Sequence, residues 1–290
     1  MRQVVVGLAL LVGAVALAWG VVAIGQANGA AWIGAVIGPD RLAAEPALVE
    51  ALFNLLVFVP LIVVGIVGAM FDRRNALAPG TRPLASFGLG TVIGFAGLSV
   101  AVLYGYLAGA LTSNPVAASA SASGVLLLGL GAIVVQVTGE EIYFRGWLQP
   151  ALTRRWGWAA GIVASALAFA ALHVAGGARA PISLVNLFLG GLMFGLFAAR
   201  GGGLAAAVGA HLAWNALEQL GYGLDPNPGI GSFGAIADLE LAGAAVWGGS
   251  DQGLNGSIGM TIALLAIVVP LAMTSWRRLP ATPLPTPATA

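Results

Sequence analysis

The sequence predicts an all-α fold, a polytopic membrane bundle of about eight transmembrane helices. Three observations predict it: 59% of the 290 residues are hydrophobic, only 8% are charged, and long apolar runs recur along the chain. A soluble domain carries charge on roughly a quarter of its residues, and about 20 apolar residues suffice for one helix to cross a bilayer. We therefore expect lipid to surround most of this chain.

Eight apolar runs are long enough to cross a membrane as helices. The first run also resembles a signal peptide, but it is longer than the roughly 7–15 apolar residues of such a segment, which favours an anchoring span. Pro150 is expected to end the fourth run and Pro181 to begin the sixth. The expected spans are 4–24, 48–70, 86–111, 123–149, 158–174, 182–199, 204–222 and 256–275.

The placement of arginine supports an even number of spans. The chain has twelve basic residues, all of them Arg. If the N-terminus is inside, cytoplasmic segments hold Arg2, Arg73, Arg74, Arg82, Arg154, Arg155, Arg200, Arg277 and Arg278, whereas Arg41 and Arg179 fall outside and Arg145 falls within a span. The positive-inside rule predicts this bias. We expect a multi-pass protein of the cell (inner) membrane with both termini in the cytoplasm.

The chain is expected to form one membrane domain with a short tail. The domain would cover 1–279, with its functional motifs in 123–222, and the Pro- and Thr-rich segment 280–290 is expected to be a disordered cytoplasmic tail. The absence of cysteine excludes disulfides and thiolate metal sites. A net charge of +1 argues against a nucleic-acid partner.

A few ionisable and polar residues fall inside the predicted spans. A charge in the hydrocarbon costs a few kcal/mol or more, so each such residue is a candidate for function. They are Glu140, Glu141 and Arg145 in the fourth span, His173 in the fifth, and His211 and Asn215 in the seventh. No other histidine occurs in the chain, and the presence of both inside apolar spans predicts a functional site.

Helical spacing separates the two glutamates. Glu141 and Arg145 are four residues apart with the carboxylate first, an arrangement that favours an ion pair. Glu140 points about 100° away from Glu141, on the face that carries Gln136 and Phe144. The sequence therefore predicts a paired Glu141 and a Glu140 free to act on another group.

The two histidines also have partners at helical spacing. His211 and Asn215 lie four residues apart and present two polar groups on one face, and Glu218 continues that face toward the outer interface. Phe169 precedes His173 by one turn, where its ring would restrict the imidazole. A carboxylate, two imidazoles and an amide from three helices are thus expected to meet.

These groups are sufficient to hydrolyse a peptide bond. Glu140 would take a proton from a water molecule that His173 helps to hold, a general-base role that typically contributes about 10²–10⁴-fold. His211 and Asn215 would donate hydrogen bonds to the oxyanion of the tetrahedral intermediate, and one such donor is worth about 10²–10³-fold.

The three motifs resemble those of the CAAX protease and bacteriocin-processing family, which includes the type II CAAX prenyl endopeptidases. The pattern is Glu-Glu-x-x-x-Arg, then Phe-x-x-x-His, then His-x-x-x-Asn, over roughly 123–222. The resemblance implies an all-helical membrane fold whose site faces a cavity open to the cytoplasm. It implies catalytic roles for Glu140, His173, His211 and Asn215, with Glu141, Arg145 and Phe169 in support.

Zinc is the chemical alternative to metal-free catalysis. Glu140, His173 and His211 would make a hydrolytic zinc site with water as the fourth ligand, and members of the family are often called metalloproteases. Against zinc, the chain has no His-Glu-x-x-His spacing, and Asn215 suits an oxyanion donor better than a zinc ligand. Catalysis without a cofactor is therefore favoured.

The resemblance and the polar residues together predict an intramembrane endopeptidase. Its partners would be membrane lipids and a membrane-associated protein or peptide substrate, possibly lipidated. Two alternatives stay open: a non-catalytic membrane scaffold or immunity protein, and a proton-coupled transporter that uses Glu140 and the histidines as a relay.

The depths of the site residues do not agree if every span is upright. His173 lies about 22 Å into its span at 1.5 Å per residue, whereas Glu140 and His211 lie about 10–15 Å from the same side. Either the span 158–174 is strongly tilted, or the segment 147–157 lies within the membrane.

Overall fold

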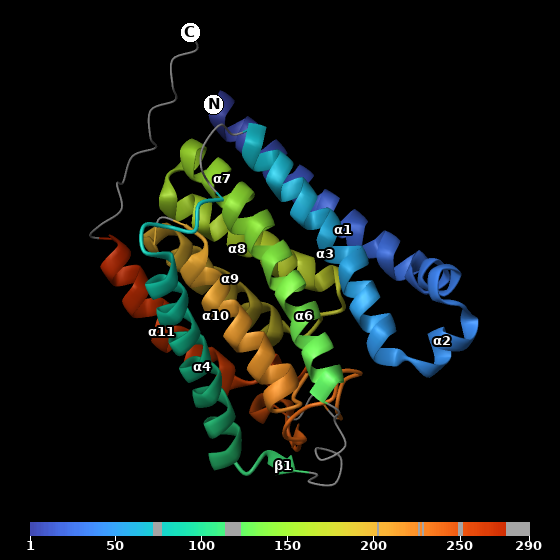
Figure 1. Cartoon of the computed structure of the whole chain (residues 1–290). Helices are drawn as coiled ribbons and strands as arrows, with labels where there is room; N and C mark the ends of the chain where they lie inside the picture. The colour runs from blue at the N-terminus through green and yellow to red at the C-terminus, as the bar shows by residue number, and fades with distance from the viewer. Residues whose placement is uncertain are drawn as a thin grey trace.

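The computed structural model describes residues 1–71, 77–113, 123–201, 203–225, 227, 229–248 and 252–276. Within these ranges the chain is almost entirely helical, and its helices run back and forth through one bundle (Figure 1). The α-helices are α1 (Arg2–Ile37), α2 (Pro39–Ala44), α3 (Pro46–Phe71), α4 (Pro83–Leu107), α6 (Ser123–Glu140), α7 (Gln149–Trp156), α8 (Trp158–Ala175), α9 (Pro181–Gly201), α10 (Ala205–Ala216) and α11 (Ile258–Trp276). The other elements are the π-helices η1 (Glu141–Leu148) and η2 (Leu217–Gly221), the 3₁₀-helices η3 (Ala245–Trp247) and η4 (Gly253–Gly256), and the strands β1 (Leu111–Ser113) and β2 (Leu239–Leu241).

The described part of the chain confirms a multi-pass membrane protein. Seven of its helical segments are long and apolar enough to cross a bilayer. The expected span 204–222 is helical from Ala205 to Gly221, but it divides into α10, which has 12 residues, and η2. Because α1 begins and α11 ends at the same end of the bundle (Figure 1), the passage through α10 and η2 completes an even number of crossings.

The fourth expected span is longer than predicted. Pro150 was expected to end it, but the helical segment continues through α6, η1 and α7 as far as Trp156. Pro150 falls at the second position of α7, directly after the change from π- to α-helical hydrogen bonding. The regular bonding is interrupted at this change in any case, so the helix continues through Pro150.

Small residues hold α10 against α4. A Cβ added to Gly90 would lie 2.1 Å from the carbonyl oxygen of Ala206, and one added to Gly94 would lie 2.3 Å from that of Ala210. Only glycine allows this close approach of two helix backbones, as expected for helix packing in a bilayer. Since His211 directly follows Ala210, this contact sets the position of the third motif.

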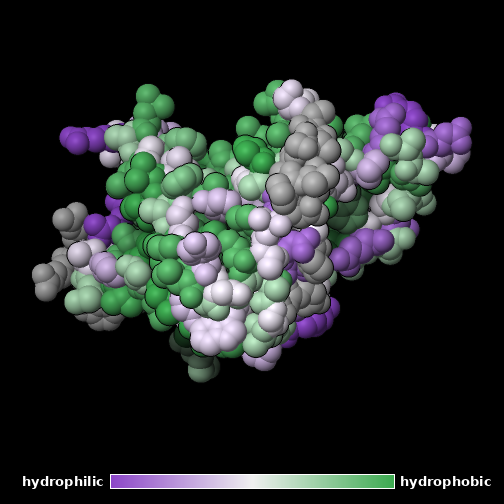
Figure 2. Space-filling model, turned by 90° about the horizontal axis from the view of Figure 1, so that it is seen from below, coloured by the Kyte–Doolittle hydropathy of each residue, from purple (hydrophilic) through white to green (hydrophobic). Residues whose placement is uncertain are grey.

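The end of the bundle away from the termini carries most of the irregular chain. β1 and β2 form a two-stranded antiparallel sheet there, with Leu111 opposite Leu241. Figure 2 views the molecule from this end, where pale residues gather toward the middle of the face beside green apolar residues, and much of the strongest purple lies at the edges. The expected tail 280–290, like Arg73, Arg74, Arg277 and Arg278, lies outside the described residues.

Candidate active site

The first motif lies where α6 changes into a π-helix. Glu140 is the last residue of α6 and Glu141 the first of η1, and their residues are 2% and 0% exposed. π-Helical turns inside α-helices occur frequently at functional sites. Both carboxylates reach His211 on α10, Glu140 at 3.6 Å and Glu141 at 2.9 Å.

Glu141 and Arg145 form the predicted pair. Nη1 of Arg145 lies 3.0 Å from Oε1 of Glu141, and neither side chain is exposed. Nη2 of Arg145 donates a hydrogen bond to the carbonyl oxygen of Gly191 at 3.0 Å, and the guanidinium lies 4.6 Å from the ring centre of Phe169. The pair thus connects the first motif to α9 and to the second motif.

His211 lies between the two glutamates. Its Nδ1 is 2.9 Å from Oε1 of Glu141, and its Nε2 is 3.6 Å from Oε2 of Glu140. The imidazole also stacks on Phe194, with ring centres 4.3 Å apart and planes inclined by 16°. The sequence did not indicate either contact, because the bond to Glu141 depends on how η1 and α10 pack and the stacking on how α9 and α10 pack.

Glu140 is placed directly behind the cavity wall. Nε2 of Gln136 donates to Oε1 of Glu140 at 3.4 Å, which confirms that the two share a face. Oε2 has no hydrogen-bond partner among the described residues. Glu140 itself does not line the cavity, but its two neighbours Gln136 and His211 do. One layer of side chains therefore separates the predicted base from the cavity.

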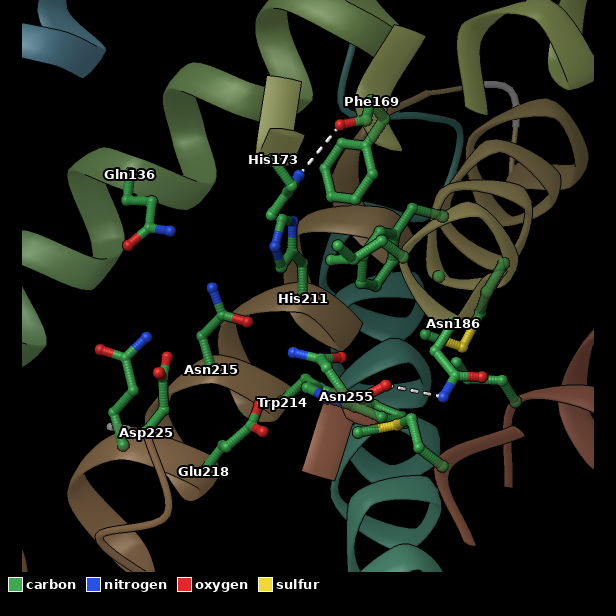
Figure 3. Close-up of a pocket in the computed structure, with 17 residues that line it drawn as sticks. Gln136, Phe169, His173, Asn186, His211, Trp214, Asn215, Glu218, Asp225 and Asn255 are labelled. Atoms are coloured by element: carbon green, nitrogen blue, oxygen red, sulfur yellow. Dashed lines mark hydrogen bonds between the residues drawn. The ribbon is translucent and has the colours of Figure 1, made fainter. Parts of the chain in front are cut away.

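His173 has one nitrogen fixed and the other available. Its Nδ1 lies 2.9 Å from the carbonyl oxygen of Phe169, shown by a dashed line in Figure 3. A carbonyl can only accept, so Nδ1 carries the proton, and Nε2 of the neutral ring is a hydrogen-bond acceptor. The ring of Phe169 lies 4.6 Å from that of His173, as the spacing of the second motif predicted.

The second and third motifs meet at one cavity. Its volume is about 150 Å³, enough for several water molecules. The sticks in Figure 3 place His173 beside His211, with Asn215 one turn farther along α10 and Glu218 beyond it. The described residues thus bring His173, His211 and Asn215 together as predicted, and add Gln136 and Glu218 to the wall.

The tilt of α8 explains how His173, near the end of its helix, reaches the level of the other site residues. In Figure 1, α8 crosses the bundle at an angle to its neighbours, so that its last turn comes level with the middle of α10. The structure shows the tilt that the first explanation requires. The segment 147–157 also belongs, as far as Trp156, to the long apolar helix that begins at Ser123, which agrees with the second explanation.

The cavity occupies the half of the bundle away from the termini. Besides the motif residues it is lined by Asp225 and Asn255, which belong to the irregular segment at that end. The resemblance implied a cavity open to the cytoplasm, and the arginines implied cytoplasmic termini. The two expectations together would place the cavity near the end of the termini, whereas the structure places its lining toward the opposite end.

The alternative zinc site does not fit this arrangement. Within the ranges that the structure describes, no three His, Cys, Asp or Glu side chains are grouped as metal ligands would be. Of the three expected ligands, His173 and His211 line the cavity and Glu140 lies behind it.

One comparison with known proteins gives a match. The family model described as Rce1-like, type II CAAX prenyl endopeptidase, matches residues 122–217. This segment runs from the residue before α6 into η2 and contains every position of the three motifs, so the resemblance read from them is confirmed. No curated protein and no solved structure matches the chain.

Proposed function

We propose that the chain is an intramembrane endopeptidase of the Rce1-like family of type II CAAX prenyl endopeptidases, whose family model matches residues 122–217. Its substrate would be a membrane-associated protein or peptide, with or without a lipid anchor, that reaches the cavity beside His173. The observation that carries the proposal is the meeting of His173, His211 and Asn215 at one cavity, with Glu140 3.6 Å from His211.

The reaction begins with a water molecule in the cavity. Glu140 takes one proton from it, and Nε2 of His173 accepts its other O–H. The water oxygen attacks the carbonyl carbon, and Asn215 and His211 donate hydrogen bonds to the oxyanion. When the C–N bond breaks, Glu140 gives its proton to the leaving amine. The products are a carboxylic acid and an amine, so water is the one co-reactant consumed.

Gln136 gives Glu140 access to that water. It is the side chain between Glu140 and the cavity, and its bond to Glu140 is long at 3.4 Å. A hydrogen bond of that length is weak, so a small rotation of Gln136 would free Oε1 of Glu140 for a water molecule of the cavity.

Glu141 and Arg145 act through His211. Glu141 accepts a hydrogen bond from Nδ1–H of His211. In the proposed step the ring carries a proton on both nitrogens, so that Nε2–H donates to the oxyanion. Arg145 compensates the charge of Glu141, so that the buried carboxylate stays in place. We assign them as positioning residues, with Phe169 and Phe194 fixing the planes of the two imidazoles.

The substitution Glu140→Gln tests the proposal. The full chain, reconstituted in liposomes, is incubated with a peptide library anchored by an acyl chain at the N-terminus or by a prenyl group at the C-terminus, and products are identified by mass spectrometry. We expect the wild type to cleave and Glu140→Gln to lose at least about 10²-fold in rate with an unchanged melting temperature. The control Asp40→Asn alters an exposed acid on α2 and should cleave normally.

Two outcomes would contradict the proposal. If Glu140→Gln cleaves as fast as the wild type, Glu140 is not the base. If neither protein cleaves any anchored peptide but the liposomes show a proton flux that Glu140→Gln abolishes, the chain is a transporter.

A further inference from the structure

A second carboxylate lies in the cavity, and the reaction does not use it. The sequence placed Glu218 near the outer interface, but η2 turns it inward, and the residue is only 6% exposed. It lines the cavity one turn beyond Asn215 (Figure 3). No described residue donates a hydrogen bond to its carboxylate or forms an ion pair with it. A buried charge without a partner is costly, which points to a partner that arrives with the substrate.

The acidic character extends to the mouth of the cavity. Asp225 also lines it and is exposed, and it lies within electrostatic range of Glu218 and of Glu50. This end of the bundle therefore attracts cations. Closely spaced carboxylates repel one another, and a positive charge between them removes that repulsion.

The described arginines at this end do not neutralise these carboxylates. Arg41 forms a bidentate pair with Glu45 on α2. Arg179 donates to the carbonyl oxygens of Val174 and Ala178. His173 lies within electrostatic range of Asp225, but no cationic side chain of the described residues forms an ion pair with Glu218.

We propose that Glu218, assisted by Asp225 at the mouth, forms an anionic subsite that binds a cationic group of the substrate next to the scissile bond. This inference rests on the proposed peptidase function and names its substrate class: peptides with a lysine or arginine side chain, or a free α-amine, near the cleaved bond. A carboxylate and an ammonium or guanidinium group form a charge-assisted hydrogen bond.

The spacing along α10 and η2 limits where that cation lies. Seven residues separate His211 from Glu218, or about 10 Å at 1.5 Å per residue. An extended peptide covers that distance in about three residues. The cation therefore belongs to one of the three residues on one side of the scissile bond, with its side chain pointing toward Glu218.

Peptide selectivity tests the subsite. Reconstituted full-length protein is given anchored peptides that differ only in Lys or Gln at each of the three positions on either side of the cleaved bond, with and without N-terminal acetylation. We expect one position, or the free amine, to raise kcat/KM by about 10–100-fold, the range of a hydrogen bond to a charged group. Glu218→Gln should reduce this Lys-to-Gln ratio toward one.

Two further variants keep the test independent of the folding of Glu218→Gln. Asp225→Lys changes an exposed residue, and it should lower the Lys-to-Gln ratio and favour a Glu peptide. Glu240→Gln, on β2 at the same end but outside the cavity wall, removes the same charge and should leave the ratio unchanged.

Binding to the inactive protein separates this inference from the proposed function. The Glu140→Gln variant should bind a fluorescent Lys peptide about tenfold or more tightly than the corresponding Gln peptide. Added salt should reduce this preference, mainly by screening the charge of the exposed Asp225. If the wild type cleaves peptides, Glu140→Gln does not, and Lys and Gln peptides are cleaved equally, the proposed subsite is wrong and the proposed peptidase function is supported. If no anchored peptide is cleaved, the peptidase is wrong, and equal binding of Lys and Gln peptides would overturn the subsite as well.

Discussion

Oε1 of Glu141 lies 2.9 Å from Nδ1 of His211, a residue 70 positions later in the chain. The same oxygen accepts from Arg145, so one carboxylate joins the first and third motifs. Because all three side chains are buried, each depends on the others for its charge compensation. This network, and not Glu140, holds the imidazole of His211 in place. The residues that position the site are therefore different from the proposed base.

Arg145→Met should destabilise the protein because it leaves Glu141 buried without its cation. Breaking a buried ion pair by removing one partner typically costs about 3–5 kcal/mol. The free energy of unfolding in mixed micelles measures the loss. The double variant Glu141→Gln/Arg145→Met should recover part of it, and an Arg145→Met protein as stable as the wild type would contradict the network.

Glu141→Gln should differ from Glu140→Gln. We expect Glu141→Gln to lower both the melting temperature and the cleavage rate, because it weakens the bonds to Arg145 and His211. Glu140→Gln should lower the rate alone, since Glu140 has one long hydrogen bond, to Gln136, among the described residues. Parallel melting curves and peptide cleavage assays would show whether the two glutamates have these separate roles.

Gly94→Val should displace α10 and with it His211. Its Cβ would lie 2.3 Å from the carbonyl oxygen of Ala210, and such overpacking costs about 1–3 kcal/mol or more. Gly88→Val is the matched control on the same helix, where an added Cβ meets nothing within 4 Å. We expect lower stability and cleavage for Gly94→Val only; equal behaviour of the two variants would argue against the close contact.

Cysteine labelling should establish which side of the membrane the cavity faces. The chain has no cysteine, so Thr81→Cys, exposed at the end of the termini, and Ile236→Cys, 73% exposed near the cavity, can be labelled singly. From the arginine bias we expect an impermeant maleimide to label Ile236→Cys on intact cells and Thr81→Cys only after permeabilisation. The reverse pattern would place the cavity in the cytoplasm.

A strong chelator should leave peptide cleavage unchanged, because the proposed steps use only side chains of this chain. The purified protein should also contain less than stoichiometric zinc by elemental analysis. Loss of cleavage in chelator, restored by added zinc, would show instead that Glu140, His173 and His211 rearrange into a metal site.

The fold class and the motif residues could be predicted because they depend on local properties. Hydropathy over about 20 residues identifies a membrane helix whatever its neighbours are. The contacts between Glu141 and Arg145, Gln136 and Glu140, and Phe169 and His173 all join residues four apart, so the period of one helix was enough to predict them.

Packing between helices decided the rest. The close approach of α4 to α10 at Gly90 and Gly94, the oblique course of α8, and the two π-helical turns determine that Glu141 bonds to His211 and that Glu218 faces the cavity. The sequence carries no simple signal for these relations, because they depend on the relative position and rotation of separate helices. The periodicity of the sequence shows which side chains share a face of one helix. Where that helix lies in the bundle depends on its contacts with all of its neighbours together.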